Sequence, residues 1–278
     1  MLLVLLGATA GVASWWVLRP VLAMPGLART NHRDELVPTA GGLAIILALA
    51  GPAVVGAIDR TLDSQTAPMD QDGSIWIPVA VAVLGFGLLG LIDDVAAAGS
   101  GGGFRGHASS LLRGRLTTGG LKLVGGGAVA MVAVSLVGRD SVAILLGDAA
   151  IVALAANLAN LLDLAPGRTT KVALLSWVAL VIAGEFGPVD HAASYVVGSA
   201  AGILVPELRE RLMLGDTGSN VIGATLGLTA IAQLAGPARL VLALVLVVLN
   251  VAAEIVSFSH VINQTAPLRW FDRLGRAG

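Results

Sequence analysis

The chain has 278 residues, of which 56% are hydrophobic and only 13% are charged. A soluble domain is about one quarter charged, so this composition excludes a soluble protein and indicates an integral membrane protein. The chain contains no cysteine, which excludes disulfides, thiolate catalysis and cysteine-bound metals, and its net charge of −1 carries little information by itself.

Nine apolar runs are long enough to cross about 30 Å of hydrocarbon. We therefore expect an all-α fold, a polytopic membrane helical bundle of about nine transmembrane helices that forms one integral membrane domain over residues 1–278. Residues 2–18 lack the basic start and the cleavage site of a signal peptide, so we expect a retained first span. Glycines interrupt several runs, and eight or ten spans are alternatives. The runs cover approximately residues 2–18, 40–58, 75–92, 119–137, 141–161, 171–187, 190–206, 220–235 and 238–257.

The positive charges predict the orientation of these spans. Fourteen of the seventeen lysines and arginines fall in one set of connections, and only Arg60, Arg139 and Arg239 fall in the other. Because cytoplasmic loops are enriched in basic residues, we expect the N-terminus outside and the C-terminus in the cytoplasm. A cytoplasmic loop over residues 93–118 and a cytoplasmic tail over residues 258–278 follow from this orientation. The outer connections are mostly tight turns, so we expect any chemistry on the cytoplasmic side.

Polar features mark the cytoplasmic ends of the second, third and fourth spans. The segment Asn31–Gly42, which includes Arg33, predicts either a solvated turn or a basic lip beside a site. Asp93 and Asp94 end the third span, where acids oppose the helix dipole, and this mismatch favours a functional role. Lys122 lies inside the start of the fourth span, where an ammonium requires an anionic partner.

Three polar side chains end the fifth span, at Asn157, Asn160 and Asp163. At helical spacing they cover roughly one third of the helix circumference, so they face a common direction. Arg168 and Lys171 follow directly after a Pro-Gly pair. Amide and carboxylate groups in this arrangement suit Mg²⁺ and nucleotide contacts, although single asparagines also link membrane helices to one another. The presence of Asp163 favours a site.

The stretch Leu214–Asn220 opens the eighth span with a carboxylate, two glycines and two hydroxyls. Gly218 allows a close approach of the backbone to a ligand, and Thr217 or Ser219 is suited to cap the helix. The free N–H groups of the first turn favour a phosphate, and Asp216 is suited to hold a Mg²⁺ ion that binds one.

The remaining polar residues lie in the tail and within two spans. His260 and Arg269 belong to the tail, whose arginines either clamp a diphosphate or bind lipid headgroups. Asn250 and Glu254, one helical turn apart near the end of the ninth span, either line the cavity or bond to neighbouring helices. Asp148, inside the fifth span toward the outside, fits neither group.

The order of these elements resembles a known family. An Asp-Asp pair ends one span, a lysine opens the next, Asn-x-x-Asn-x-x-Asp ends another and Gly-Asp-Thr-Gly-Ser opens a fourth. With Pro-Thr-Ala-Gly-Gly at residues 38–42, this series resembles the polyprenyl-phosphate N-acetylhexosamine-1-phosphate transferase family, which includes the bacterial translocase that forms lipid I. The resemblance runs from about Arg33 to the tail. Each motif is weak alone, and the specificity comes from their order on one membrane face.

The resemblance implies transfer of a sugar-1-phosphate from a UDP-sugar to a polyprenyl phosphate, with release of UMP. This reaction would take place at the cytoplasmic face of a bacterial plasma membrane and would initiate a cell-envelope glycan. Two anions must come together, so charge neutralisation and positioning would dominate catalysis. The implied cofactor is Mg²⁺, with Mn²⁺ as an alternative. The implied partners are the two substrates and the bilayer, with a homodimer as an option and no nucleic acid.

The resemblance also implies roles for individual residues. The expected metal ligands are Asn160 and Asp216. The expected catalytic residues are Asp93, Asp94, Lys122 and Asp163. Asp93 and Asp94 would surround the acceptor phosphate, Lys122 would neutralise a phosphate, and Asp163 would lie toward the nucleotide. The expected substrate-binding residues are Arg33, Asn157, Arg168, Lys171, His260 and Arg269.

Three departures from the family pattern concern the donor. Pro166 stands where the family's Asp-Gly-x-Asp-Gly continuation has its second aspartate, and the histidine-rich loop before the last span is missing. The chain also has about one span fewer than the usual ten. The metal-site aspartate, the Asp pair and the lysine are all present.

Other classes of protein predict other patterns. A transporter or channel predicts polar residues near mid-membrane, whereas here they cluster at the inner ends of the spans. A CDP-alcohol phosphatidyltransferase would carry Asp-Gly-x-x-Ala-Arg, which is absent. A catalytically altered homologue that binds lipid phosphate or a partner is the main alternative.

Overall fold

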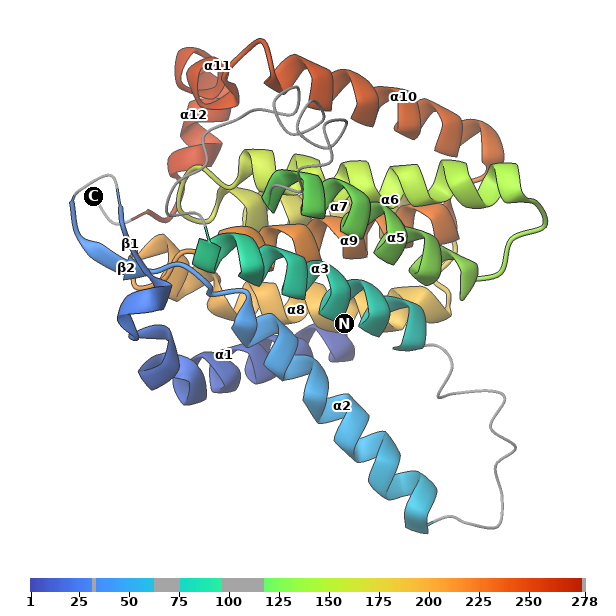
Figure 1. Ribbon diagram of the computed structural model, residues 1–278, viewed down its shortest axis with the longest axis horizontal. Helices are drawn as coiled ribbons and strands as arrows, with labels where there is room; N and C mark the ends of the chain where they lie inside the picture. Colours follow the sequence, from blue (N-terminus) through green and yellow to red (C-terminus); the bar gives the residue numbers. More distant parts are fainter. Residues whose placement is uncertain (32–33, 63–75, 97–117, 277–278) are drawn as a thin grey trace.

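The computed structural model describes residues 1–31, 34–62, 76–96 and 118–276. Long helices that run side by side dominate these parts of the chain (Figure 1). The helices are α1 Leu2–Leu22, α2 Leu43–Leu62, α3 Ile77–Ala96, α5 Thr118–Ser135, α6 Val142–Leu162, α7 Arg168–Ala183, α8 Pro188–Leu208, α9 Gly215–Gln233, α10 Gly236–Ala253, α11 Phe258–Gln264 and α12 Ala266–Arg273, with a short 3₁₀ turn at Pro25–Leu27.

A helix occupies the place of each apolar run predicted from the sequence. Within the described residues, four helices, α1, α3, α6 and α10, are long and apolar enough to cross a membrane. Shorter apolar stretches lie within α2, at Leu43–Val54, and within α5, at Gly119–Ser135. An all-helical backbone satisfies its own hydrogen bonds, as a chain within hydrocarbon requires. These helices have the character of a membrane protein.

A small β-hairpin, which the sequence did not predict, connects α1 to α2. Its strands β1 (Ala28–Thr30) and β2 (Leu36–Pro38) pair antiparallel, with Ala28 opposite Pro38. Three residues per strand are too few to show an alternating pattern. The hairpin is tied to the bundle because Arg29 donates from Nη2 to the carbonyl oxygen of Asp94 at 2.7 Å.

Helix α9 forms the centre of the bundle and contacts α3, α6, α7 and α8. Nearly all its residues from Thr217 to Ile231 are buried. Its glycines and threonines make it less hydrophobic than the outer helices, and Thr225 and Thr229 satisfy their hydroxyls on carbonyl oxygens four residues earlier. A helix that faces protein rather than lipid can be small and polar. By contrast, α10 lies at the edge and exposes most of its apolar side chains.

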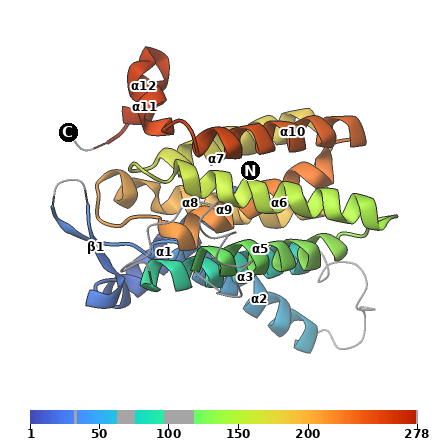
Figure 2. The same ribbon diagram turned by 45° about the horizontal axis from the view of Figure 1, so that its top comes forward.

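Polar elements gather at one end of the bundle. The hairpin, α11 and α12 lie toward this end in both views (Figures 1 and 2). Helix α3 continues through Asp93 and Asp94 to Ala96, so the loop expected from residue 93 begins later, and residues 97–117 lie outside the described part. The expected tail begins with α11 and α12.

The other end of the bundle explains Asp148, for which the sequence suggested no role. Its buried carboxylate pairs with Arg139 at 2.5 Å and with Arg239 at 2.6 Å. These two arginines come from the turn before α6 and the first turn of α10. Asp148 is therefore a charge-paired link between helices.

Candidate functional site

The entry to α9 is held by backbone contacts with the segment before α2. Gly41 and Gly42 donate their N–H groups to the carbonyl oxygens of Met213 and Leu214, at 3.0 and 2.9 Å. Gly215 then takes a φ of +70°, and a Cβ there would lie 1.9 Å from the carbonyl oxygen of Thr39. Only glycine fits this turn. The segment expected as a lip therefore lies directly beside the start of α9.

Asp94 caps the N-terminus of α9. Its Oδ1 accepts the N–H of Asp216 at 3.0 Å, and its Oδ2 accepts the N–H and hydroxyl of Thr217 at 2.9 and 2.6 Å. The prediction that these first N–H groups are free for a phosphate is wrong, because a carboxylate already occupies them. Neither Thr217 nor Ser219 caps the helix. Asp94 is buried and holds α3 against α9, where Gly90 also allows close backbone contact.

Four helices bring one polar cluster together, which we call the Lys122 cluster: Asp93, Lys122, Asn160 and Asp216. The ammonium of Lys122 pairs with Asp93 Oδ2 at 2.8 Å and also contacts Asp216 Oδ2. Asn160 donates from Nδ2 to the same Asp216 oxygen at 3.4 Å, and Ser219 donates its hydroxyl to Asn160 Oδ1 at 3.2 Å. The predicted anionic partner of Lys122 is confirmed, and so is the proximity of Asn160 to Asp216.

The donor set of this cluster fits a hard divalent cation. In the described part of the chain, no three His, Cys, Asp or Glu side chains come close enough to hold a metal ion together. Mg²⁺, however, keeps several waters and takes as few as one or two carboxylates. Asp93 and Asp216 already hold one cation, the ammonium of Lys122. Asn160 would have to rotate its amide to offer oxygen in place of nitrogen.

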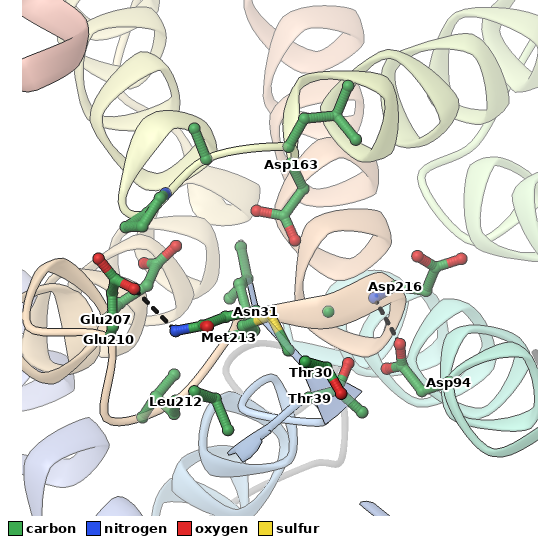
Figure 3. A pocket seen from close by; sticks show the side chains of 16 residues that line it. Thr30, Asn31, Thr39, Asp94, Asp163, Glu207, Glu210, Leu212, Met213 and Asp216 are labelled. Carbon is green, nitrogen blue, oxygen red and sulfur yellow. Dashed lines mark hydrogen bonds between the residues drawn. The ribbon is translucent and has the colours of Figure 1, made fainter. Parts of the chain in front are cut away.

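A cavity of about 310 Å³ opens beside the Lys122 cluster (Figure 3). Its lining includes five acidic side chains and no basic one among the described residues. Asp163 points into it from the end of α6 (Figure 3). Burial raises the pKa of Asp163 well above its usual 3.8, and the negative charge of Glu207 adds to this effect. The acidic lining residues are Asp94, Asp163, Glu207, Glu210 and Asp216.

Glu207 holds the N-terminal end of a second helix, α7, through its carboxylate. Its Oε1 accepts the N–H of Gly167 and its Oε2 accepts the hydroxyl of Thr170, both at 2.9 Å. The side chain is 2% exposed. Its charged sequence neighbours at residues 209–211 would suggest a solvated loop and do not reveal this role. The position of Glu207 directly after the apolar run at residues 190–206 is the signal that could have revealed this role.

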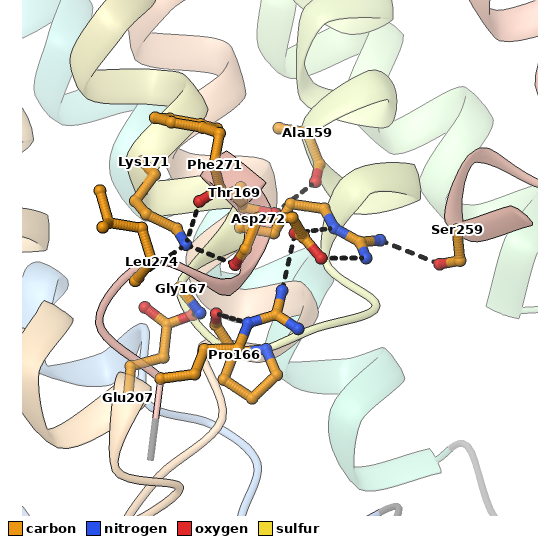
Figure 4. Close-up of polar contacts among 12 residues, drawn as sticks. Ala159, Pro166, Gly167, Thr169, Lys171, Glu207, Ser259, Phe271, Asp272 and Leu274 are labelled. Atoms are coloured by element: carbon orange, nitrogen blue, oxygen red, sulfur yellow. Dashed lines mark hydrogen bonds and ion pairs between the residues drawn. The ribbon is translucent and has the colours of Figure 1, made fainter. Parts of the chain in front are cut away.

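Arg168 and Lys171 do not reach the cavity as expected for substrate-binding residues. Arg168 makes a two-pronged ion pair with Asp272, at 2.7 and 3.1 Å, and bonds to the Ser259 hydroxyl at 2.9 Å (Figure 4). Lys171 donates to three carbonyl oxygens at the end of α12, from Phe271, Asp272 and Leu274. Both side chains are buried. They anchor the C-terminal helix, and their substrate role is not supported.

The same network braces one wall of the cavity. Arg276 pairs with Asp272 at 2.7 Å and donates from Nε to the carbonyl oxygen of Pro166 at 3.1 Å. Pro166 lines the cavity. Burial raises the pKa of Asp272, but the hydrogen bonds and charge of Arg168, with the charge of Arg276, outweigh burial and leave the pKa below its usual 3.8. The ion pairs therefore persist at neutral pH and are lost only as the pH falls through that lowered value.

Three further predicted substrate-binding residues, Asn157, His260 and Arg269, also lie outside the cavity lining. Asn157 donates to Asn250 of α10 at 2.6 Å, so this pair links helices rather than facing a nucleotide. His260 is exposed on α11, and Arg269 donates to the Asn263 carbonyl within the tail. Neither residue lines the cavity. Arg33 lies outside the described residues.

A second cavity, also about 310 Å³, lies between α6, α7, α9 and α10. Its lining is apolar except for Thr169 and Ser176. Leu162, the residue before Asp163, belongs to this lining. We call this cavity the apolar groove. The two cavities are therefore lined by consecutive residues, Leu162 in the apolar groove and Asp163 in the acidic cavity.

Comparisons with known proteins add no relative. No family model matches the chain, and no curated protein matches it.

Proposed function

We propose that this chain is a Mg²⁺-dependent phosphoglycosyl transferase similar to the polyprenyl-phosphate N-acetylhexosamine-1-phosphate transferases. It transfers a sugar-1-phosphate, of the N-acetylhexosamine class, from a UDP-sugar to a polyprenyl phosphate and releases UMP. The observation that carries this proposal is the Lys122 cluster, in which side chains of α3, α5, α6 and α9 meet beside the acidic cavity. All four members of the cluster belong to the motifs that carry the family resemblance.

The cluster suits a reaction between two anions. An oxygen of the lipid phosphate attacks the sugar-linked phosphorus, the bond from that phosphorus to UMP breaks, and UMP leaves with its own phosphate. Asp216, with Asn160, would hold Mg²⁺, which would supply charge neutralisation to the diphosphate. Lys122 would hold a phosphate oxygen from the opposite side of the cluster. A lipid phosphate is already ionised at neutral pH, so no residue is required as a base.

The apolar groove supports a lipid acceptor. It offers hydrocarbon-lined space along α6, α7, α9 and α10, and its lining includes Leu162, adjacent to Asp163. An extended isoprenoid chain in this groove would gain hydrophobic contact while its phosphate stays near the polar end of the bundle. A soluble acceptor would have no use for such a groove.

The proposed topology places the site in the cytoplasm. The nine helices α1 to α10 would cross the membrane, with the N-terminus outside and the Lys122 cluster at the inner face. Support comes from the bias of fourteen in seventeen basic residues toward one set of connections along the sequence. UDP-sugars are made in the cytoplasm, which agrees with this orientation.

A second candidate is a homologue that binds a lipid phosphate or a partner without turnover. The observation that favours it is the cavity lining, where no basic residue appears among the described residues and where Arg168 and Lys171 are engaged with the tail. A transporter is less well supported, because Thr225, Thr229 and Ser199 inside the bundle bond to their own helices.

The test is release of UMP by the purified full chain in detergent or nanodiscs. The reaction contains Mg²⁺, undecaprenyl phosphate and one member of a panel of UDP-sugars at a time. We expect UMP with at least one N-acetylhexosamine donor, and none when EDTA or omission of the lipid removes a component. Absence of UMP with every donor would favour the binding protein.

A further inference from the structure

The ammonium of Lys122 occupies the position of a bound cation. It lies 2.8 Å from Asp93 Oδ2 and contacts Asp216 Oδ2, so it bridges acids of two different helices. We propose that Lys122 is a tethered cation that holds Asp93 and Asp216 together in the absence of metal and that a divalent ion displaces it. This inference rests on the proposed function, because it takes Asp216 as the metal ligand.

The Lys122 ammonium and a divalent ion would compete for one oxygen, Asp216 Oδ2. Asp216 Oδ2 receives both the Lys122 ammonium and the Asn160 amide, the latter at 3.4 Å. A divalent ion bound to this oxygen would place its positive charges next to the ammonium, and like charges at such separation repel strongly. The two cations therefore exclude each other from Asp216 Oδ2.

Neighbouring acids do not relieve this competition. Asp94 is adjacent in sequence to Asp93, but its two oxygens are committed to Asp216 N–H, Thr217 N–H and the Thr217 hydroxyl. Asp163 faces the acidic cavity from the end of α6. Among the described residues, Lys122 displaced from Asp216 keeps an ion pair with one carboxylate, that of Asp93.

Lys122 is able to move without unfolding its helix. It lies in the second turn of α5, and its side chain is 22% exposed, with Asp93 at 24% and Asp216 at 26%. A lysine has a flexible four-carbon stem and a compact charge, so its head can swing toward the open side of the cluster. In that position the ammonium can bind an incoming anion such as a phosphate oxygen.

The exchange reverses the charge of the cluster. Two carboxylates and one ammonium give a net charge of −1, which repels a diphosphate. Entry of a divalent ion, with Lys122 retained nearby, changes this to +1, which attracts a diphosphate. Lys122 therefore couples metal binding to binding of the anionic donor, and the metal precedes or accompanies the donor.

The experiment measures Mn²⁺ binding to the purified full chain by the loss of the free-ion EPR signal, with no donor or acceptor present. Lys122→Met removes the competing charge, and we expect its Kd for Mn²⁺ to fall about tenfold. Lys122→Gln, a polar second variant, should show the same change. Lys122→Arg keeps the charge and should stay near wild type. Thermal unfolding of each variant confirms that it is folded.

The outcomes separate this inference from the proposed function. Unchanged or weaker Mn²⁺ binding in folded Lys122→Met and Lys122→Gln would overturn the competition. If Asp216→Asn loses Mn²⁺ while the lysine variants show no gain, the metal site stands and only the inference fails. If Asp216→Asn binds Mn²⁺ as tightly as wild type, the metal assignment and the inference fail together.

Discussion

Adjacent acids at the end of α3 have different roles. Side chains of consecutive helical residues point about 100° apart, and here Asp93 meets Lys122 while Asp94 meets the first turn of α9. Asp94 is 6% exposed, whereas the Asp93 side chain is 24% exposed. The family resemblance implied a catalytic role for both. The geometry makes Asp94 the residue that positions Asp216, whereas Asp93 pairs with Lys122 and stays partly exposed.

Substitution of these two acids should separate stability from function. Asp94→Asn places an NH₂ group against N–H donors and loses a charged cap, which should lower the free energy of unfolding by about 2 kcal/mol. Asp93→Asn keeps the shape of a partly exposed residue and should change it by less than about 0.5 kcal/mol. Denaturant unfolding in detergent, followed by tryptophan fluorescence, measures both. Equal losses would contradict the assignment of Asp94 as a cap.

The helices differ in what their surfaces contact. Helix α9 is less apolar than α10, yet α9 is buried and α10 is exposed. Hydropathy reports contact with lipid, whereas close packing at the centre of a bundle requires small residues. The apolar groove lies between these two kinds of helix, which is where a lipid chain could enter from the bilayer.

Filling the apolar groove should impair long acceptors selectively. Ala179 on α7 lines the groove and is exposed, so Ala179→Trp would occupy its space without disturbing the core. We expect KM for undecaprenyl phosphate to rise about tenfold, with little change for a short isoprenyl phosphate or for the UDP-sugar. The control is Val178→Trp, at an exposed neighbour outside the groove lining. Equal kinetics in the two variants would rule out the groove as the lipid site.

Sequence patterns predicted the helices well because long apolar runs have few alternatives within a membrane. The predicted helix boundaries were less accurate at the starts of α7 and α9. Helix α9 starts at Gly215 rather than at residue 220, and α7 starts at Arg168 rather than at residue 171. In both places polar residues belong to the first helical turn because a carboxylate from another helix, Asp94 or Glu207, holds that turn. Such partners cannot be read from local sequence.

The contacts of the candidate site were predictable for residues that have few possible partners. Lys122 required an anion within the apolar part of α5, and Asp216 and Asn160 were expected to meet. Arg168 and Lys171 were assigned wrongly because their partner, Asp272, lies 104 and 101 residues away in the tail. An arginine after a helix break looks the same whether it binds a diphosphate or a buried aspartate.

At the scale of the whole molecule, charge is distributed unequally between the two ends of the bundle. One end contains the Lys122 cluster, the acidic cavity and the tail, whereas the other holds the closed group of Asp148, Arg139 and Arg239. The closed group has its charges satisfied within the chain. The open end combines the acidic cavity, the partly exposed ammonium of Lys122 and the end of the apolar groove at Leu162.

The measurement that tests the central claim most directly follows the phosphorus atom. The full chain is supplied with Mg²⁺, undecaprenyl phosphate and an accepted UDP-sugar labelled with ³²P at the sugar-linked phosphate. We predict that the label enters the organic-soluble lipid in equal amount to the UMP released, and that Asp216→Asn abolishes this transfer while the variant remains folded. Label that stays in water as sugar phosphate, or transfer that survives Asp216→Asn at limiting Mg²⁺, would contradict the account.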